Sequence, residues 1–148
     1  MKQLFKKSVV ASVLVLATTG ASAGGSQYYA NASAAAPYSK AVQSGDLVYV
    51  SGLLGRGADG NVLKGLDAQV KGAMDSLVGT LKSVGLTADD VVKCQVFMTD
   101  ISKLSDLGKV YVTYFKPDRL PARTSIGVSA LPFGAEVEID CIAHVAAK

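Results

Sequence analysis

The chain of 148 residues carries 15 Lys and Arg against 12 Asp and Glu, a formal net charge of +3. Three of the lysines lie in residues 1–23, which contain no carboxylate, so residues 24–148 are formally neutral. A neutral chain without a cluster of Lys and Arg lacks the positively charged surface with which proteins bind the phosphates of nucleic acids. We therefore expect no nucleic-acid partner, and the length of residues 24–148 fits one domain.

Residues 1–23 have the order of parts that is typical of a secretory signal. Lys2, Lys6 and Lys7 precede an uncharged apolar run, and the small residues 21–23 form a cleavage-type site. The apolar run is shorter than the about 20 residues that span a bilayer, which makes a retained anchor the weaker alternative. The sequence predicts a cleaved signal peptide and an exported protein, periplasmic or secreted, with no membrane contact in its mature form.

The next segment, residues 24–36, is small and polar without a sustained period, which predicts a flexible N-terminal arm. The domain proper is expected at residues 37–148. Within it, residues 46–52 are rich in β-formers and end at Gly52, which predicts a strand. Turn-forming residues at 58–61 favour a hairpin after that strand.

Two helices and a strand are predicted in the middle of the chain. Residues 66–84 place apolar side chains three and four positions apart, which indicates a helix that stops at Gly85. Residues 91–99 alternate, with apolar side chains on both faces, as in a central strand. A second helical pattern over 101–114 ends before Pro117, because proline disfavours helix in the residue before it.

Two further strands are predicted at 123–128 and 136–145, which gives the order β-α-β-α-β-β. This order predicts an α/β (α+β) two-layer sandwich, a mixed sheet with both helices on one face. The final strands are apolar on both faces, so we expect an oligomer that buries the open face of the sheet.

Arg123 and Glu138, in these final strands, are candidates for chemistry. The planar guanidinium of Arg123 matches a carboxylate, although an ordinary ion pair is the common role of such a residue. Glu138 shares one strand face with Glu136 and Asp140. If that face is buried near Arg123, Glu138 could hold or deprotonate a water beside a bound carboxylate. A solvated sheet face explains the same pattern equally well.

The remaining reactive residues give weak signals. Cys94 and Cys141 lie in no CxxC or Cys/His metal spacing, so one disulfide and two buried thiols both stay open. His144 is the single histidine, which excludes a mechanism that needs a histidine pair, and such a residue is usually structural or solvated.

Successive blocks of the sequence resemble those of the RidA/YjgF family. They lie, in order, at residues 36–42, 50–52, 91–100, 121–125, 131–132 and 137–143. The specific part is Pro121-Ala122-Arg123, with Glu138 fifteen residues after the arginine. The resemblance implies a chorismate-mutase-like fold and a homotrimer with clefts between subunits. It also implies hydrolysis of small 2-imino or enamine acids to 2-keto acids and ammonia, without cofactor or metal.

By matching motif, the resemblance implies a role for each of several residues. Arg123 would bind the substrate carboxylate and Glu138 would position the attacking water. Tyr38, Ser51, Gly52 and Ser125 would complete the substrate site. The family fold places Cys94 beside Cys141, where a cross-strand disulfide is open, but two buried thiols are slightly favoured because bridging requires specific geometry.

The sequence departs from the family pattern at two positions. Ser125 stands where many deaminases carry Cys, which is a mild change because no thiol nucleophile is needed. Gly108 stands where they carry Asn, three residues before Tyr111, which removes a side-chain hydrogen bond from the cleft. A non-catalytic carboxylate-binding protein and a chaperone-like trimer are therefore the alternatives to an enzyme. An endoribonuclease is disfavoured by the neutral charge and the single histidine.

Overall fold

The computed structural model describes residues 25–31, 33 and 35–146. Its strands are β1 (Gln27–Tyr29), β2 (Ala41–Ser44), β3 (Leu47–Leu54), β4 (Val91–Met98), β5 (Ala122–Gly127) and β6 (Val137–His144). Its helices are α1 (Leu66–Ser83) and α2 (Leu104–Tyr111). Short 3-10 turns occupy Ala88–Asp90, Ile101–Lys103, Val112–Tyr114 and Pro132–Gly134.

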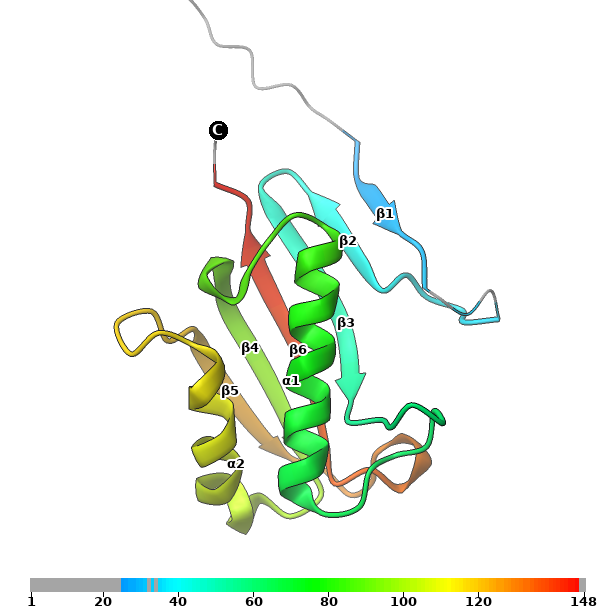
Figure 1. The fold of residues 1–148 in the computed structure, drawn as a ribbon, viewed down its shortest axis with the longest axis vertical. Coiled ribbons are helices and arrows are strands. Elements are labelled where there is room, and N and C mark those ends of the chain that lie inside the picture. Colours follow the sequence, from blue (N-terminus) through cyan, green and yellow to red (C-terminus); the bar gives the residue numbers. More distant parts are fainter. Residues whose placement is uncertain (1–24, 32, 34, 147–148) are drawn as a thin grey trace, which may run out of the picture.

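The six strands form one sheet in the order β1-β2-β3-β6-β4-β5. All neighbours are antiparallel except β4 and β5, which run parallel. Figure 1 shows both helices packed on the same face of this sheet. The predicted mixed sheet and two-layer α+β architecture are therefore confirmed.

The N-terminal part of the sheet differs from the expectation. Strand β1 lies inside residues 24–36, where no regular structure was expected, and it pairs with the equally unexpected β2. A strand of three residues is too short to show an alternating pattern, so only its pairing reveals it. Residues 58–61 do form a turn, but the segment around it is closed by a single bridge between Arg56 and Val62 rather than a hairpin.

Helix α1 packs closely against the end of β3. A Cβ atom on Gly55 would lie 2.1 Å from the backbone oxygen of Gln69, and one on Gly72 would lie 2.9 Å from the Cα of Gly55. Only glycine permits this approach. The buried Gln69 side chain then accepts a hydrogen bond from the backbone N–H of Glu136 at 2.7 Å, which ties α1 to the start of β6.

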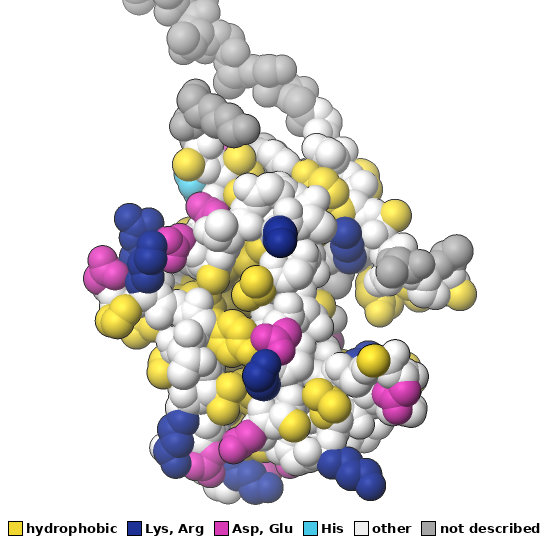
Figure 2. All heavy atoms as spheres, in the orientation of Figure 1, with side chains coloured by type: hydrophobic (Ala, Val, Ile, Leu, Met, Phe, Trp, Pro, Cys, Tyr) yellow, Lys and Arg dark blue, Asp and Glu magenta, His cyan; other side chains and the backbone are white. Residues whose placement is uncertain are grey.

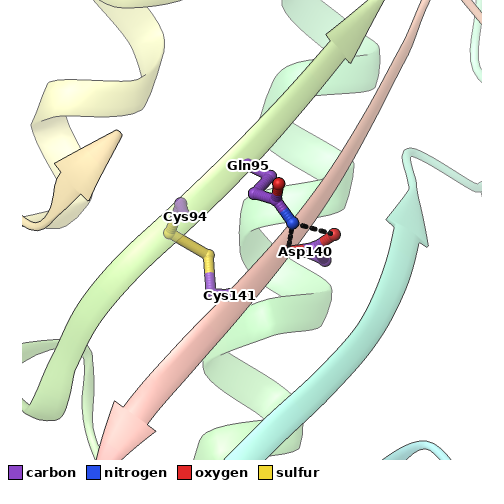
Figure 3. Close-up of a disulfide and its surroundings, with 4 residues drawn as sticks. All are labelled: Cys94, Gln95, Asp140 and Cys141. Carbon is purple, nitrogen blue, oxygen red and sulfur yellow. Dashed lines mark hydrogen bonds between the residues drawn. A yellow bond between two sulfur atoms is a disulfide. The ribbon is translucent and has the colours of Figure 1, made fainter. Parts of the chain in front are cut away.

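Cys94 and Cys141 form a disulfide between the neighbouring strands β4 and β6 (Figure 3). The two residues are direct register partners, their Cα atoms are 4.1 Å apart, and both side chains are buried. On the other face of the sheet, the next pair along these strands is Gln95 and Asp140, whose side chains lie 3.5 Å apart. The expectation that slightly favoured two thiols was wrong, because the strand register places the two Cβ atoms directly opposite each other.

The predicted signal peptide, residues 1–23, lies outside the described residues. The signal peptide stays a prediction, which N-terminal sequencing of the protein purified from its native host would check. Neither helix in the described part of the chain is both long and apolar enough to cross a membrane.

The disulfide gives the first testable prediction. It closes a loop over a sequence separation of 47 residues, which should stabilise the fold by about 4 kcal/mol through the lost freedom of the unfolded chain. Replacing both cysteines (Cys94→Ala with Cys141→Ala) should lower the free energy of unfolding by a comparable amount. Urea denaturation followed by circular dichroism measures it.

The matched control is reductant. Dithiothreitol present throughout unfolding should lower the midpoint of the unmodified protein and leave that of the double variant unchanged. An unmodified protein with the same midpoint with and without reductant would show that the bridge contributes nothing.

Candidate active site

Glu138 lines a cavity of about 590 Å³. The side chain of Glu138 lies on the sheet face opposite the helices, and the cavity reaches from there to Ser76 of α1. The neighbours of Glu138 in β6, Val137 and Ile139, point into the core, so the alternation of the strand directs Glu138 to the open face. The cavity is lined by Asn31, Tyr38, Lys40, Ser51, Gly52, Leu53, Leu54, Arg56, Ser76, Pro132, Phe133 and Glu138.

Gly52 makes room for the carboxylate of Glu138. A Cβ atom on Gly52 would lie 2.0 Å from Oε1 of Glu138, so any other residue at this position would displace the carboxylate. The pairing of β3 with β6 is irregular between Val50 and Leu53, which spans the same point. Ser51 is fixed beside it, because its hydroxyl donates to the backbone oxygen of Ser39 at 2.6 Å. The segment that carries Tyr38 is thereby attached to the cavity wall.

The surroundings of Glu138 favour its protonated form. Partial burial, and secondly the negative charge of Asp140, raise the pKa of Glu138 above its usual range. Burial also raises the pKa of Asp140, against the hydrogen bonds from Gln95, which lower it. A carboxylate with a raised pKa is a stronger base when ionised, which is the property required of a group that takes a proton from water.

Arg123 lies on the other face of the sheet. Cys94 is the register partner of both Arg123 and Cys141, so the side chains of these three residues point to the helix side. There the guanidinium carbon of Arg123 lies 5.1 Å from the centre of the Tyr111 ring. Glu138 is three positions before Cys141 and points the opposite way. One chain therefore does not bring Arg123 and Glu138 together, so the condition that the Glu138 face lies near Arg123 is not met within a single chain.

The other predicted residues divide in the same way. Tyr38, Ser51 and Gly52 line the cavity with Glu138, whereas Ser125 pairs with buried Val96 and points to the helix side with Arg123. The structure thus contains two separate halves of the expected site.

Tyr111 lies beside Arg123, and Gly108 lies three residues before Tyr111 in α2. The Tyr111 hydroxyl is buried and has no hydrogen-bond partner among the described residues. Burial raises its pKa to about 12, against the positive charge of Arg123, which lowers it. A Cβ atom on Gly108 would meet no atom within 4 Å, so the site has room for the side chain that this chain lacks.

Lys40, Arg56 and Phe133 are among the cavity residues that sequence reasoning did not assign to the site. Arg56 and Phe133 belong to loops that are far apart in the sequence and meet in the fold, where the guanidinium carbon lies 4.2 Å from the ring centre. The segment around Phe133 has the composition of a loop, and no periodic pattern marks its contact with another loop. Within the described residues, no group of three or more His, Cys, Asp or Glu side chains could hold a metal ion.

The open face of the sheet carries a band of apolar side chains beside the cavity. The register places Val42, Tyr49, Ile142, Phe97 and Ile126 on the same side as Glu138. Tyr49 and Ile126 are exposed, and the other three are half-buried. An apolar band of this kind is typical of a surface that contacts another protein chain.

Comparison with known proteins gives consistent matches over the described domain. The family model described as "Endoribonuclease L-PSP" matches residues 29–145. A 2-iminobutanoate/2-iminopropanoate deaminase of Mus musculus is 38% identical over 109 residues, 72% of this chain and 80% of the relative. A RutC family protein of Aquifex aeolicus is 36% identical over 109 residues, 72% of this chain and 87% of the relative.

Solved structures agree with the sequence matches. The crystal structure of RidA from the Antarctic bacterium Psychrobacter superposes with a TM-score of 0.72 at 34% identity, covering 76% of this chain and 92% of that one. The family match spans strands β2 to β6 and both helices. The chain therefore belongs to the Endoribonuclease L-PSP family, which includes the RutC and RidA proteins and is the RidA/YjgF family that its sequence blocks resemble.

Proposed function

We propose that the protein hydrolyses small 2-imino acids to 2-keto acids and ammonia. The observation that carries this proposal is the position of Glu138, a partly buried carboxylate with a raised pKa, held in a cavity by the glycine at position 52. A mouse relative named 2-iminobutanoate/2-iminopropanoate deaminase supports the reaction class.

The reaction needs little from the protein beyond a placed water and an oriented substrate. The carbon of a protonated imine is already electrophilic, so water can add to it when a base accepts one of its protons. Glu138 is that base in our proposal. The proton on Glu138 then passes to the amino nitrogen, and the C–N bond breaks as the C=O bond forms. Glu138 takes the hydroxyl proton at this point and returns it to the released ammonia, so that one iminium ion and one water give one keto acid and one ammonium ion. Atoms and charge balance without an oxidant or reductant.

We propose that the substrate carboxylate is bound by Arg123 of a second copy of the chain. Arg123 is exposed at the edge strand β5 and points away from the cavity of its own chain. The apolar band on the open face, next to the cavity, supports an assembly in which a neighbouring chain covers this face. A homotrimer with three identical contacts, as the family resemblance implies, would close such a ring and complete each site from two chains.

The alternative is a protein that binds a carboxylate ligand without turnover. Two features favour it: a Cβ atom on Gly108 would meet no atom within 4 Å, and the Tyr111 hydroxyl has no hydrogen-bond partner in the described residues. A ligand that raises the melting temperature without forming product would support this alternative. A chaperone-like trimer differs from both, because its suppression of aggregation should survive loss of Arg123.

The enzyme proposal predicts distinct effects of two variants. Glu138→Gln should lower kcat about 100-fold or more, because the base is lost while the shape is kept. Arg123→Ala should raise KM by about tenfold or more, because a charge-assisted contact to the substrate carboxylate is lost. The assay generates the imine with an amino-acid oxidase and follows its trapping by semicarbazide, which the active protein should suppress.

Arg119→Ala is the matched control for Arg123→Ala. Arg119 is an exposed residue close in sequence to Arg123 and does not line the cavity. The Arg119→Ala variant should suppress trapping of the imine by semicarbazide as strongly as the unmodified protein does. If the unmodified protein failed to reduce trapping and Arg123→Ala behaved identically, the enzyme proposal would be abandoned.

The raised pKa of Glu138 predicts the pH dependence of the rate. Glu138 must be ionised to accept a proton, so kcat should fall as the pH falls through its raised pKa. The charge of Asp140 is one cause of this rise, and Asp140→Asn should therefore move the acid limb of the profile to lower pH. Profiles of both proteins with the same imine measure the shift, since protonation of the substrate affects both equally. An acid limb that stayed in place, or moved to higher pH, would contradict the assignment of Glu138 as the base.

A further inference from the structure

Arg56 and Phe133 form a stacked pair on the wall of the Glu138 cavity. The guanidinium carbon of Arg56 lies 4.2 Å from the centre of the Phe133 ring, and Nη1 of Arg56 donates to the backbone oxygen of Gly60 at 2.6 Å. These two contacts hold the guanidinium in one orientation although the residue is exposed. Figure 1 shows the two loops that carry them side by side below the sheet.

Phe133 occupies an unusual backbone conformation for this role. Its φ is +57°, in the left-handed region that a bulky residue rarely adopts, and its side chain is 77% exposed. Such a conformation persists only where the surrounding structure imposes it, and it is common at ligand sites. The loop therefore presents an aromatic ring at the cavity and keeps Arg56 against it.

The cavity wall carries more positive than negative charge. Its lining includes two cations, Lys40 and Arg56, and one carboxylate, Glu138. No carboxylate of the described residues lies within 4.0 Å of the charged nitrogens of Lys40 or Arg56. On the face drawn in Figure 2, by contrast, several Lys and Arg side chains lie next to Asp or Glu. Three ion pairs away from the cavity are Lys71 with Asp75, Lys109 with Asp106 and Lys116 with Asp89.

A substrate with a single carboxylate leaves the positive charges of Lys40 and Arg56 without a negative partner. In the proposed function, Arg123 of a second copy binds the carboxylate next to the imine carbon. Arg56 and Lys40 then have no anionic partner in the site, although Arg56 is held with donors of its guanidinium still available. A second carboxylate at the far end of the substrate supplies that partner, since a guanidinium binds a carboxylate through parallel hydrogen bonds.

We propose that the preferred substrates are 2-imino dicarboxylic acids, with Arg56 binding the distal carboxylate against the Phe133 ring and Lys40 adding positive charge. The inference rests on the proposed function for the reaction itself, and it adds the substrate class and the residue that selects it. Arg56 is thereby a specificity-determining residue, distinct from Glu138 and Arg123.

The test compares two imines of equal chain length. Oxidation of glutamate gives 2-iminoglutarate, and oxidation of norvaline gives 2-iminopentanoate, which lacks only the distal carboxylate. In the semicarbazide assay the purified protein should have a kcat/KM about tenfold or more higher for 2-iminoglutarate. Arg56→Gln should remove this preference, because it should lower kcat/KM far more for 2-iminoglutarate than for 2-iminopentanoate. Arg56→Lys should keep part of the preference, because it keeps the charge.

The matched control is Lys64→Gln. Lys64 is an exposed cation outside this cavity, so its loss changes the net charge equally and should leave the preference intact. An equal rate with both imines in the unmodified protein would overturn the inference. So would an equal loss of both activities in Arg56→Gln, because that result indicates a structural role of the stacked pair.

A binding measurement separates failure of the inference from failure of the proposed function. The keto products, 2-oxoglutarate and 2-oxopentanoate, can be compared by their effect on the melting temperature. If neither imine is hydrolysed, but 2-oxoglutarate alone raises the melting temperature in an Arg56-dependent way, the reaction is wrong and the ligand class stands. If both imines are hydrolysed at equal rates and the two products stabilise equally, the reaction stands and the ligand class is wrong.

Discussion

Strand β6 pairs with β3 on one side and with β4 on the other, and the alternation of its side chains fixes both the core and the candidate site. Val137, Ile139 and Cys141 point to the helices, where Cys141 joins β4 through the disulfide. Glu138 and Asp140 point to the open face. A shift of one residue in this register would point Glu138 into the core and separate Cys141 from Cys94. The same strand register therefore determines both the disulfide and the direction of the Glu138 carboxylate.

The same register separates Glu138 from Arg123. In one chain the two residues point to opposite faces, so a reaction that uses both requires two chains. This constraint connects features that are otherwise unrelated: an arginine stacked on a tyrosine at an edge strand, a cavity on the open face, and an apolar band beside that cavity. In the proposed assembly, the contact between chains would bury the apolar band and would also complete the site, because one chain holds only Glu138 or Arg123 at each cavity.

Much of the architecture could be predicted from the sequence, because it follows from patterns with a clear period. The spacing of Val70, Leu77 and Leu81 marks α1, and the alternation around Cys94 and Cys141 marks two central strands. Strands β1 and β2 were missed because they are short and lie among small residues. The disulfide depended on register, which neither cysteine reveals by itself.

The candidate site was predictable only where a motif marks it. Glu138, Gly52 and Tyr38 lie together as the family resemblance implies, whereas the contact of Arg56 with Phe133 joins two loops without any sequence signal. Arg123 and Glu138 point to opposite faces because side chains alternate along each strand, and this can be worked out only when the register of β5 with β4 is known. Sequence patterns thus predict which strand or helix carries a residue. They do not predict which distant loops contact each other, or which residues point to the same face of the sheet.

The most direct test of the shared site is complementation between two inactive variants. Arg123→Ala and Glu138→Gln proteins would be mixed in equal amounts, unfolded, refolded together and assayed for suppression of imine trapping. If each site takes Arg123 from one chain and Glu138 from the next, random assembly leaves about one site in four intact, and about a quarter of the unmodified activity should return. Activity no higher than that of the separately refolded variants, in a mixture shown to contain mixed oligomers, would contradict the account.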